Sequence, residues 1–91
     1  MATHRILFYD YVADVAERRG PHRPAHLDHV GSEKQSGRLL MAGALGDPPH
    51  GAAFVFGPDT EPDAIEAFVG ADPYVDAGLV SGWRIELWNV V

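Results

Sequence analysis

The sequence predicts an α+β fold in which a four-stranded antiparallel sheet carries two helices on one of its faces. Three observations support this prediction. Four segments have the β-branched and aromatic content of strands, two segments repeat apolar residues at helical spacing, and the order along the chain is β-α-β-β-α-β. The chain has 91 residues, which suffice for one domain over residues 1–91 and leave no room for a second hydrophobic core.

The first half of the chain contains one predicted strand and one predicted helix. Residues 4–12 (HRILFYDYV) are rich in β-branched and aromatic side chains and predict a strand. Residues 13–23 carry mixed charges and a Gly-Pro pair, which is typical of a loop or a short helical turn. Pro24 suits the first turn of a helix, because the N–H that proline lacks has no partner there. We expect this helix to end at residue 35 or 36, before Gly37.

Two strands that form a hairpin come next. Residues 38–45 (RLLMAGAL) and residues 51–57 (GAAFVFG) are both largely apolar, and the sequence between them, GDPPH, is typical of a turn. Because the connection is short, the two strands are expected to pair antiparallel.

The last third of the chain is expected to supply the second helix and the fourth strand. Thr60 is the expected N-cap of this helix, with carboxylates in the first turn. Asp72-Pro73 should end the helix, because the residue before a proline disfavours α geometry. Residues 74–78 are expected to form a turn, and residues 82–91 (GWRIELWNVV) the last strand. This order of elements is that of the ferredoxin-like, split βαβ motif.

Composition argues against several classes of partner. The net charge is −6, with 13 acidic and 7 basic residues, and the basic residues are scattered, so no basic face for a nucleic acid is expected. No apolar run is long enough to span a bilayer, and no signal peptide is visible. The chain has no cysteine, which fits a reducing compartment. We therefore expect a cytoplasmic protein that binds neither nucleic acid nor membranes.

The strands are apolar on both faces, although a sheet with helices on one face should have a polar second face. In the last strand, Trp83, Ile85 and Leu87 lie on one face, and Trp88 lies on the other. A small domain with an uncovered apolar face is typical of an oligomer, so we expect a homodimer that forms through the sheets and leave larger assemblies open. Either Trp88 or Phe54 of the third strand should face the partner. Long loops that cover the face are the alternative.

His26 and Asp72 are the candidate residues for acid/base chemistry. His26 is expected beside the buried stripe of Leu27 and Val30, on the side of the helix that faces the sheet. Asp72 is expected at the end of the second helix, on the same face of the sheet, so the two side chains could meet. A carboxylate beside an imidazole fixes its tautomer and raises its basicity. The alternatives are a structural histidine bonded to a backbone carbonyl and a turn aspartate.

A metal site is the weaker interpretation of the histidines. His22, His26 and His29 have i, i+4 and i+7 spacing, but Pro24 should place His22 outside the helix, and no acidic residue has a suitable helical spacing. We therefore expect no bound metal and no other cofactor.

The order of several short motifs resembles the YCII-related family, whose members are also called YciI-like proteins. The motifs are R-P-x-H-L at residues 23–27, GRLLMAGAL at 37–45, GAAFVF at 51–56, Ala67-Phe68, Asp72-Pro73-Tyr74 and Ala77-Gly78-Leu79. Together they cover almost the whole chain. The resemblance implies a ferredoxin-like fold of the dimeric α/β-barrel kind and a small-molecule pocket in which His26 and Asp72 form a pair with Arg23 nearby.

The resemblance also implies a class of activity. One related member is a dehydrochlorinase that acts on a chlorinated hydroxyquinol, and similar folds include muconolactone isomerases. The leading hypothesis is therefore a cofactor-independent acid/base enzyme, of the isomerase or lyase class, that acts on a small cyclic or aromatic acid. His26 would exchange the proton, Asp72 would orient His26, Arg23 would attract the substrate's anionic group, and Tyr9 would line the pocket. The alternative is a non-catalytic module that binds a small molecule.

Overall fold

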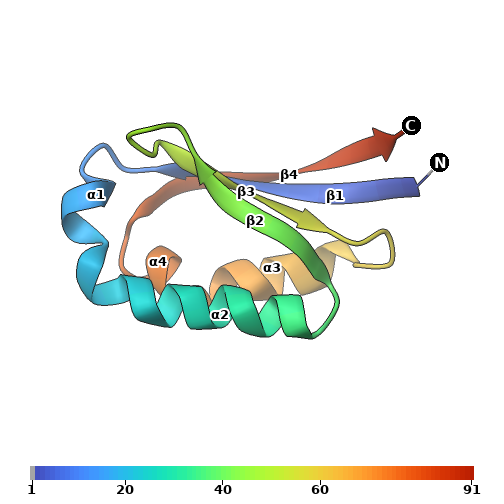
Figure 1. Ribbon diagram of the computed structural model, residues 1–91, viewed down its shortest axis with the longest axis horizontal. Coiled ribbons are helices and arrows are strands. Elements are labelled where there is room, and N and C mark those ends of the chain that lie inside the picture. The colour runs from blue at the N-terminus through green and yellow to red at the C-terminus, as the bar shows by residue number, and fades with distance from the viewer. Residues whose placement is uncertain (1) are drawn as a thin grey trace.

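The computed structural model describes residues 2–91, in which four strands form one antiparallel sheet with the helices on one side (Figure 1). The strands lie in the order β2-β3-β1-β4, so the predicted ferredoxin-like fold is confirmed. None of the helices in this range is long and apolar enough to cross a membrane. The elements in chain order are β1 (Ala2–Tyr11), α1 (Val15–Arg18), the short 3-10 helix η1 (Gly20–His22), α2 (Arg23–Gln35), β2 (Leu39–Leu45), β3 (Gly51–Phe56), α3 (Pro62–Gly70), α4 (Pro73–Asp76) and β4 (Val80–Val90).

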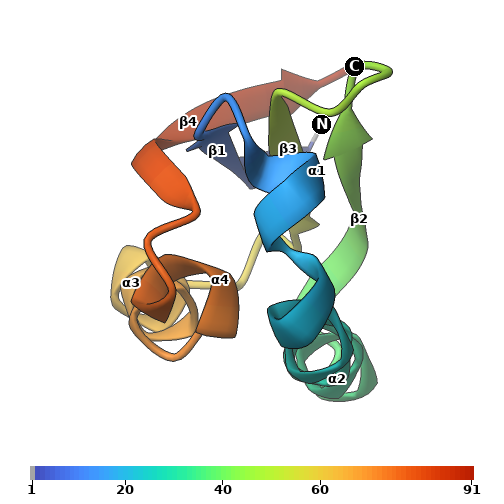
Figure 2. The same cartoon turned by 90° about the vertical axis from the view of Figure 1, so that its left-hand side faces the viewer.

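Strand pairing places one set of side chains beneath the helices. Leu7 of β1 lies opposite Phe54 of β3 and Ile85 of β4, and Tyr9 lies opposite Ala52 of β3. Alternate residues of a strand point to opposite faces, so these side chains share one face of the sheet. Figure 2 shows α2 and α3 side by side against this face, with α4 at the end of the layer nearer the viewer.

The main hydrophobic core fills the space between this face and the helices. Leu7, Phe54 and Phe56 from the strands pack with Ile65 and Phe68 from α3, and each of these side chains is at most 3% exposed. Full burial of one such side chain contributes roughly 1.5–3 kcal/mol to stability. This core determines the distance between the helices and the sheet, and therefore the size of the space that remains between them where the core ends.

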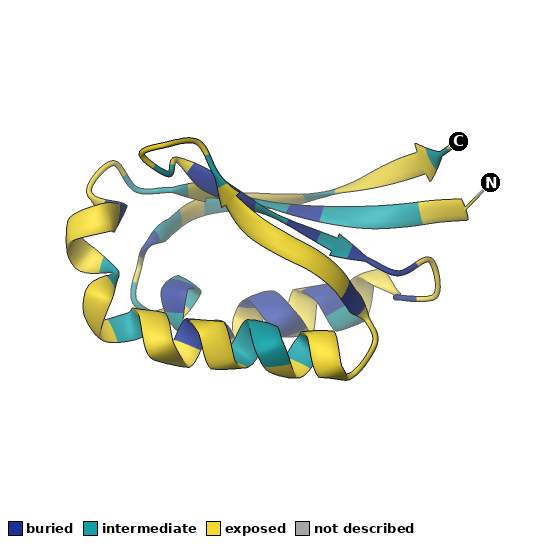
Figure 3. Ribbon diagram, viewed as in Figure 1, coloured by how far each residue is buried: buried dark blue, intermediate teal, exposed yellow. Residues whose placement is uncertain are grey.

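The opposite face of the sheet is covered by no helix within residues 2–91 (Figure 1). It carries the half-buried side chains of Ile6, Phe8 and Val55 and the 46% exposed side chain of Trp88. The long exposed segments of β2 and β4 are visible in Figure 3. Of the two residues expected as alternatives for the partner-facing position, Phe54 lies in the core, whereas Trp88 lies on the open face.

Thr60 is not the N-cap of the second helix, in contrast to the sequence-based expectation. The helix α3 begins at Pro62, and its N-cap is Glu61 in an extended backbone conformation. Thr60 is instead buried, and its carbonyl oxygen accepts a hydrogen bond from the guanidinium of Arg5 at 2.7 Å. The proline explains the shift, because the residue before a proline disfavours α geometry and proline is favoured at the first helical position.

Two further local expectations are also wrong. Leu27 is 51% exposed rather than part of a buried stripe, and His26, which is 7% exposed, is the buried residue of α2. The helix lies at the edge of its layer, so only a narrow side of it meets the sheet. Residues 74–78 form more than a turn, because Pro73–Asp76 make the short helix α4 before Gly78 adopts a φ of 74°.

Candidate functional site

The backbone around Asp72 places its carboxylate inside the protein. Asp72 is extended (φ −76°, ψ 121°), as expected for a residue before proline, and it is the N-cap of α4. Its Oδ1 accepts a hydrogen bond from the backbone N–H of Tyr74 at 3.0 Å. The sequence placed Asp72 at the end of one helix, whereas the structure places it at the start of the next, where a carboxylate satisfies a free N–H.

Two side chains complete the hydrogen bonds of Asp72. The Nδ1 of His26 lies 2.8 Å from Oδ1, and the hydroxyl of Tyr9 donates to Oδ2 at 2.8 Å. Asp72 is fully buried, and burial alone would raise the pKa of its carboxyl. The hydrogen bonds from His26, the Tyr74 backbone and Tyr9, together with the charge of His26, nevertheless hold that pKa below its ordinary value. The site therefore contains a buried, ionised carboxylate.

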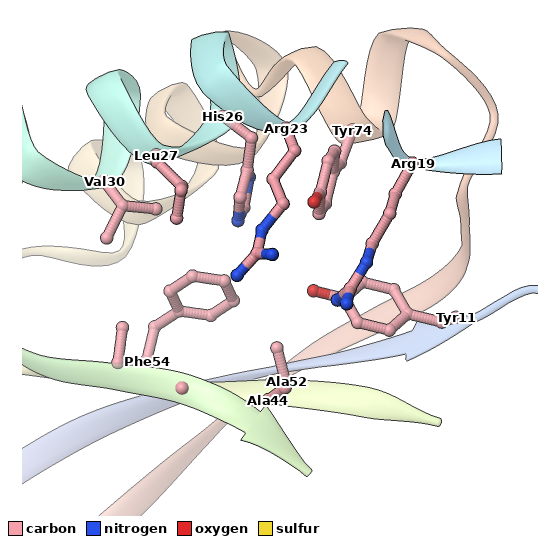
Figure 4. Close-up of a pocket in the computed structure, with 12 residues that line it drawn as sticks. Tyr11, Arg19, Arg23, His26, Leu27, Val30, Ala44, Ala52, Phe54 and Tyr74 are labelled. Carbon is pink, nitrogen blue, oxygen red and sulfur yellow. The ribbon is translucent and has the colours of Figure 1, made fainter. Parts of the chain in front are cut away.

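The imidazole of His26 has a fixed orientation. Its ring stacks on the ring of Tyr74, with 3.7 Å between centroids and 2° between planes. A carboxylate can only accept a hydrogen bond, so the neutral ring carries its proton on Nδ1, and Nε2 is left as a free acceptor. No partner for Nε2 is found within residues 2–91, and Figure 4 shows the His26 ring pointing into a cavity. This nitrogen is the position from which His26 can exchange a proton.

A cavity of about 180 Å³ lies in front of His26. Its roof consists of α2 and α4, and its floor consists of β2 and β3, where small residues lie beside Phe54 (Figure 4). Ala44 and Ala52 are floor residues, and their short side chains leave the space open. The cavity is close in size to an engineered cavity of about 150 Å³ that holds benzene. It therefore has the volume for a ligand with a single ring.

Arg23 and Tyr9 differ in how far they fit the sequence-based expectation. Arg23 is the first residue of α2, and its guanidinium extends into the cavity (Figure 4). Tyr9 is not among the residues that line this cavity, so the expectation that Tyr9 lines the pocket is wrong. Tyr9 lies behind Asp72, 1% exposed, because β1 passes beneath the start of α4. Burial and the charge of Asp72 raise the pKa of the Tyr9 hydroxyl, which therefore remains a hydrogen-bond donor.

Three polar cavity residues were not predicted. Arg19 lies between α1 and η1, Tyr11 ends β1, and Tyr74 lies in α4, and all three line the cavity. Tyr11 belongs to the same strand face as Tyr9, which was the available signal for it. Arg19 could not be distinguished from its neighbour Arg18, because the direction of a side chain on a single helical turn depends on how that turn packs.

The histidines do not form a metal site in the part of the chain that the structure describes. No group of three or more His, Cys, Asp or Glu side chains within residues 2–91 is arranged to hold a metal ion. His22 lies in η1, before α2 begins, and the Nε2 of His29 lies 2.8 Å from the carbonyl oxygen of Phe68. The three histidines at helical spacing therefore have three different environments.

Sequence comparison gives two matches that agree with each other. The model of the YCII-related domain matches residues 3–89. The Protein YciI of Escherichia coli O6:H1 is 34% identical over 82 residues, which are 81% of this chain and 84% of that protein. The Protein YciI of Shigella flexneri matches with the same identity and coverage.

Two solved structures illustrate the similarity of the fold. The 5-chloro-2-hydroxyhydroquinone dehydrochlorinase of Burkholderia phenoliruptrix, in complex with 2,5-dihydroxybenzoquinone, has a TM-score of 0.77 and 19% identity and covers 94% of this chain and 93% of its own. A dimeric ferredoxin-like protein from an uncultured marine organism has a TM-score of 0.53 and 15% identity and covers 99% of this chain and 88% of its own. At these identities the likeness shows the fold.

Proposed function

The chain belongs to the YCII-related family, and we propose that it is a cofactor-independent acid/base enzyme in which His26 exchanges a proton with a small cyclic or aromatic acid. One observation carries this proposal. The Nδ1 of His26 lies 2.8 Å from a buried carboxylate, while the opposite nitrogen of the same ring opens into a cavity of about 180 Å³. A structural histidine would need neither the free nitrogen nor the space in front of it.

The proposed reaction begins with transfer of an acidic ring proton of the ligand to Nε2 of His26. Asp72 stabilises the positive charge that forms on the imidazole and holds the ring in place. The electron pair left on the ligand has two outcomes. In an isomerisation, it takes the proton back at another carbon atom. In an elimination, it forms a double bond and expels a leaving group such as halide, and the imidazolium then passes its proton to solvent. The enzyme class is therefore isomerase or lyase.

The cavity and one solved structure with a similar fold support a one-ring ligand. Arg23 contributes a positive charge next to the free nitrogen of His26, which favours an anionic ligand and stabilises the negative charge that develops on proton removal. The dehydrochlorinase from Burkholderia phenoliruptrix has the same fold and holds a one-ring quinone. A single ring of that size fits the volume of the present cavity.

Solvent deuterium exchange tests the proposal. The protein would be incubated in D₂O with a panel of cyclic keto acids and hydroxylated aromatic acids, and loss of ring-proton signals would be followed by ¹H NMR. We expect exchange or conversion of at least one compound by the wild type and a loss of about 10²-fold or more in His26→Gln, as is usual for an acid/base residue. His29→Gln is the matched control, because His29 lies on the same helix but outside this cavity.

Two outcomes would contradict catalysis by His26. Exchange at the wild-type rate in His26→Gln would place the chemistry elsewhere. Tight binding of a panel compound without any exchange would instead favour the second candidate, a non-catalytic module that binds a small molecule. The stacking of His26 on Tyr74 is compatible with that role, because it stiffens the cavity wall whether or not a proton moves.

The same chain is proposed to act as a homodimer that forms through the open face of its sheet. Ile6, Phe8 and Val55 form an apolar centre on this face, and Trp88 extends it toward the end of β4. Exposed apolar patches of this kind usually mark interfaces. One of the similar solved structures is described as dimeric, which supports the proposal.

A further inference from the structure

The arginines of this chain divide into two groups. Four of them have a partner within residues 2–91: Arg5 bonds the carbonyl of Thr60, Arg18 pairs with Asp14, Arg38 with Glu33 and Arg84 with Glu86. The guanidinium groups of Arg19 and Arg23 have no ion-pair or hydrogen-bond partner in that range, although the chain has 13 acidic residues. Both of these arginines line the cavity in front of His26.

Two tyrosine hydroxyls add to the donors at the cavity. Figure 4 shows the guanidinium of Arg19 beside the hydroxyl of Tyr11, and the hydroxyl of Tyr74 directed into the same space. Neither hydroxyl has a hydrogen-bond partner within residues 2–91. Burial raises the pKa of both hydroxyls, although the positive charge of Arg19 acts in the opposite direction, so both remain protonated at neutral pH. They are therefore available to donate hydrogen bonds.

Side-chain acceptors are scarce in the same cavity. Its lining contains no aspartate, glutamate, asparagine or glutamine. Apart from the hydroxyl oxygens, the one side-chain acceptor in this lining is the free nitrogen of His26. A ligand that satisfies this set must present acceptor oxygens to the arginines and tyrosines and a hydrogen atom to His26. A planar carboxylate suits a guanidinium in particular, because both groups can form two parallel hydrogen bonds.

We infer that Arg19 and Tyr11 form a carboxylate subsite, and that the ligand is a one-ring carboxylic acid with an acidic hydrogen at the end opposite its carboxylate. The hydroxyl of Tyr74, whose ring stacks on His26, lies nearer to the reacting end. The ring lies between this subsite and His26, above the floor formed by Ala44 and Ala52. Arg23 lies nearer to His26 and interacts with the reacting end. The assignment of the reacting end rests on the proposed function, but the carboxylate subsite is tested by binding alone.

Calorimetric titration with a matched pair of probes tests the subsite. The probes are 4-hydroxybenzoate and 4-hydroxybenzamide, which share the ring and the hydroxyl and differ in charge. We expect the wild type to prefer the carboxylate by about tenfold or more, and Arg19→Gln to lose about tenfold or more in affinity for the carboxylate but little for the amide. Arg18→Gln is the control, because Arg18 pairs with Asp14 on the surface and does not line the cavity.

Each other result has a defined meaning. Equal affinities for acid and amide in the wild type, binding of neither probe at millimolar concentration, or an equal loss of both in Arg19→Gln would overturn the subsite. Tyr11→Phe tests the subsite independently if Arg19→Gln does not fold. It should lower the affinity for 4-hydroxybenzoate more than the affinity for 4-hydroxybenzamide. His26→Gln should keep the carboxylate preference. Loss of deuterium exchange in that variant with the preference intact separates the two proposals, because exchange depends on His26 and the preference on Arg19.

Discussion

At the scale of single residues, Asp72 determines the arrangement of the site. Its two oxygens receive hydrogen bonds from β1, α2 and α4, so one carboxylate connects three elements that are distant in the sequence. The sequence suggested His26 and Asp72 together because both helices were expected on one face of the sheet. It did not reveal the role of Tyr9, because alternation along a strand identifies a face but not which residue of the opposite layer lies above it.

Replacement of Tyr9 by phenylalanine tests its part in holding Asp72. The variant loses a buried hydrogen bond to an ionised group, and we expect a decrease of about 2 kcal/mol in the free energy of unfolding, measured with urea. Tyr11→Phe is the matched control on the same face of β1. Its hydroxyl has no hydrogen-bond partner within residues 2–91, so a change below about 0.5 kcal/mol is expected. Equal effects of the two substitutions would contradict the role assigned to Tyr9.

Acid should destabilise the protein through Asp72. The pKa of this carboxyl is lower in the folded protein than its ordinary value, so the ionised form stabilises the fold above pH about 4, where the unfolded carboxyl is also ionised. This contribution should disappear as the pH falls through the lower, folded value. We therefore expect the unfolding free energy of the wild type to decrease below pH 4 more steeply than that of Asp72→Asn, measured by urea titration at a series of pH values. Parallel pH profiles would contradict this prediction.

At the scale of elements, the sequence predicted the order and the kinds of the main helices and strands but not the short helices at the cavity. Two apolar segments and the turn residues between them identified the hairpin of β2 and β3, and Pro24 identified the start of α2 within one residue. The turns α1, η1 and α4 have three or four residues each, too short for a period to be visible. Tyr74 lies in α4 and Arg19 lies between α1 and η1, so these two missed cavity residues lie where sequence periodicity carries no information. Tyr11 is the exception, because it lies on a predicted strand.

The floor of the cavity offers a substitution that changes its volume and leaves the proposed chemistry in place. Ala44 of β2 is exposed and lines the cavity, so Ala44→Leu should fill part of the space without crowding the core. We expect a change of less than about 1 kcal/mol in stability and a loss of about tenfold or more in affinity for 4-hydroxybenzoate, measured by calorimetry. Ala25→Leu on the exposed side of α2 is the control. Unchanged affinity in Ala44→Leu would mean that the ligand does not occupy this floor.

At the scale of the whole molecule, the two faces of the sheet have different roles. One face packs on the helices and positions His26, Asp72 and the cavity, while the other presents apolar side chains to solvent. A chain of 91 residues buries a modest core, so a further apolar surface that becomes buried in a dimer would add to its stability. The sequence predicted apolar side chains on both faces of the sheet. It did not predict the face on which Phe54 lies, because both faces of β3 are apolar.

Two tryptophans on opposite faces of β4 allow the proposed dimer to be tested. Trp88 shares its face with Ile6 and Phe8, whereas Trp83 lies opposite Tyr9 on the side that faces the helices. Their exposures are similar, at 46% and 42%, so a glutamate introduces a comparable charge at each position.

We expect sedimentation velocity at micromolar concentration to show a dimer for the wild type and for Trp83→Glu and a monomer for Trp88→Glu, because the charge of the latter would have to be buried against the partner sheet. Circular dichroism would establish that both variants are folded. A monomeric wild type would contradict the proposed dimer, and dissociation by Trp83→Glu alone would place the interface on the edge of the helix-covered face.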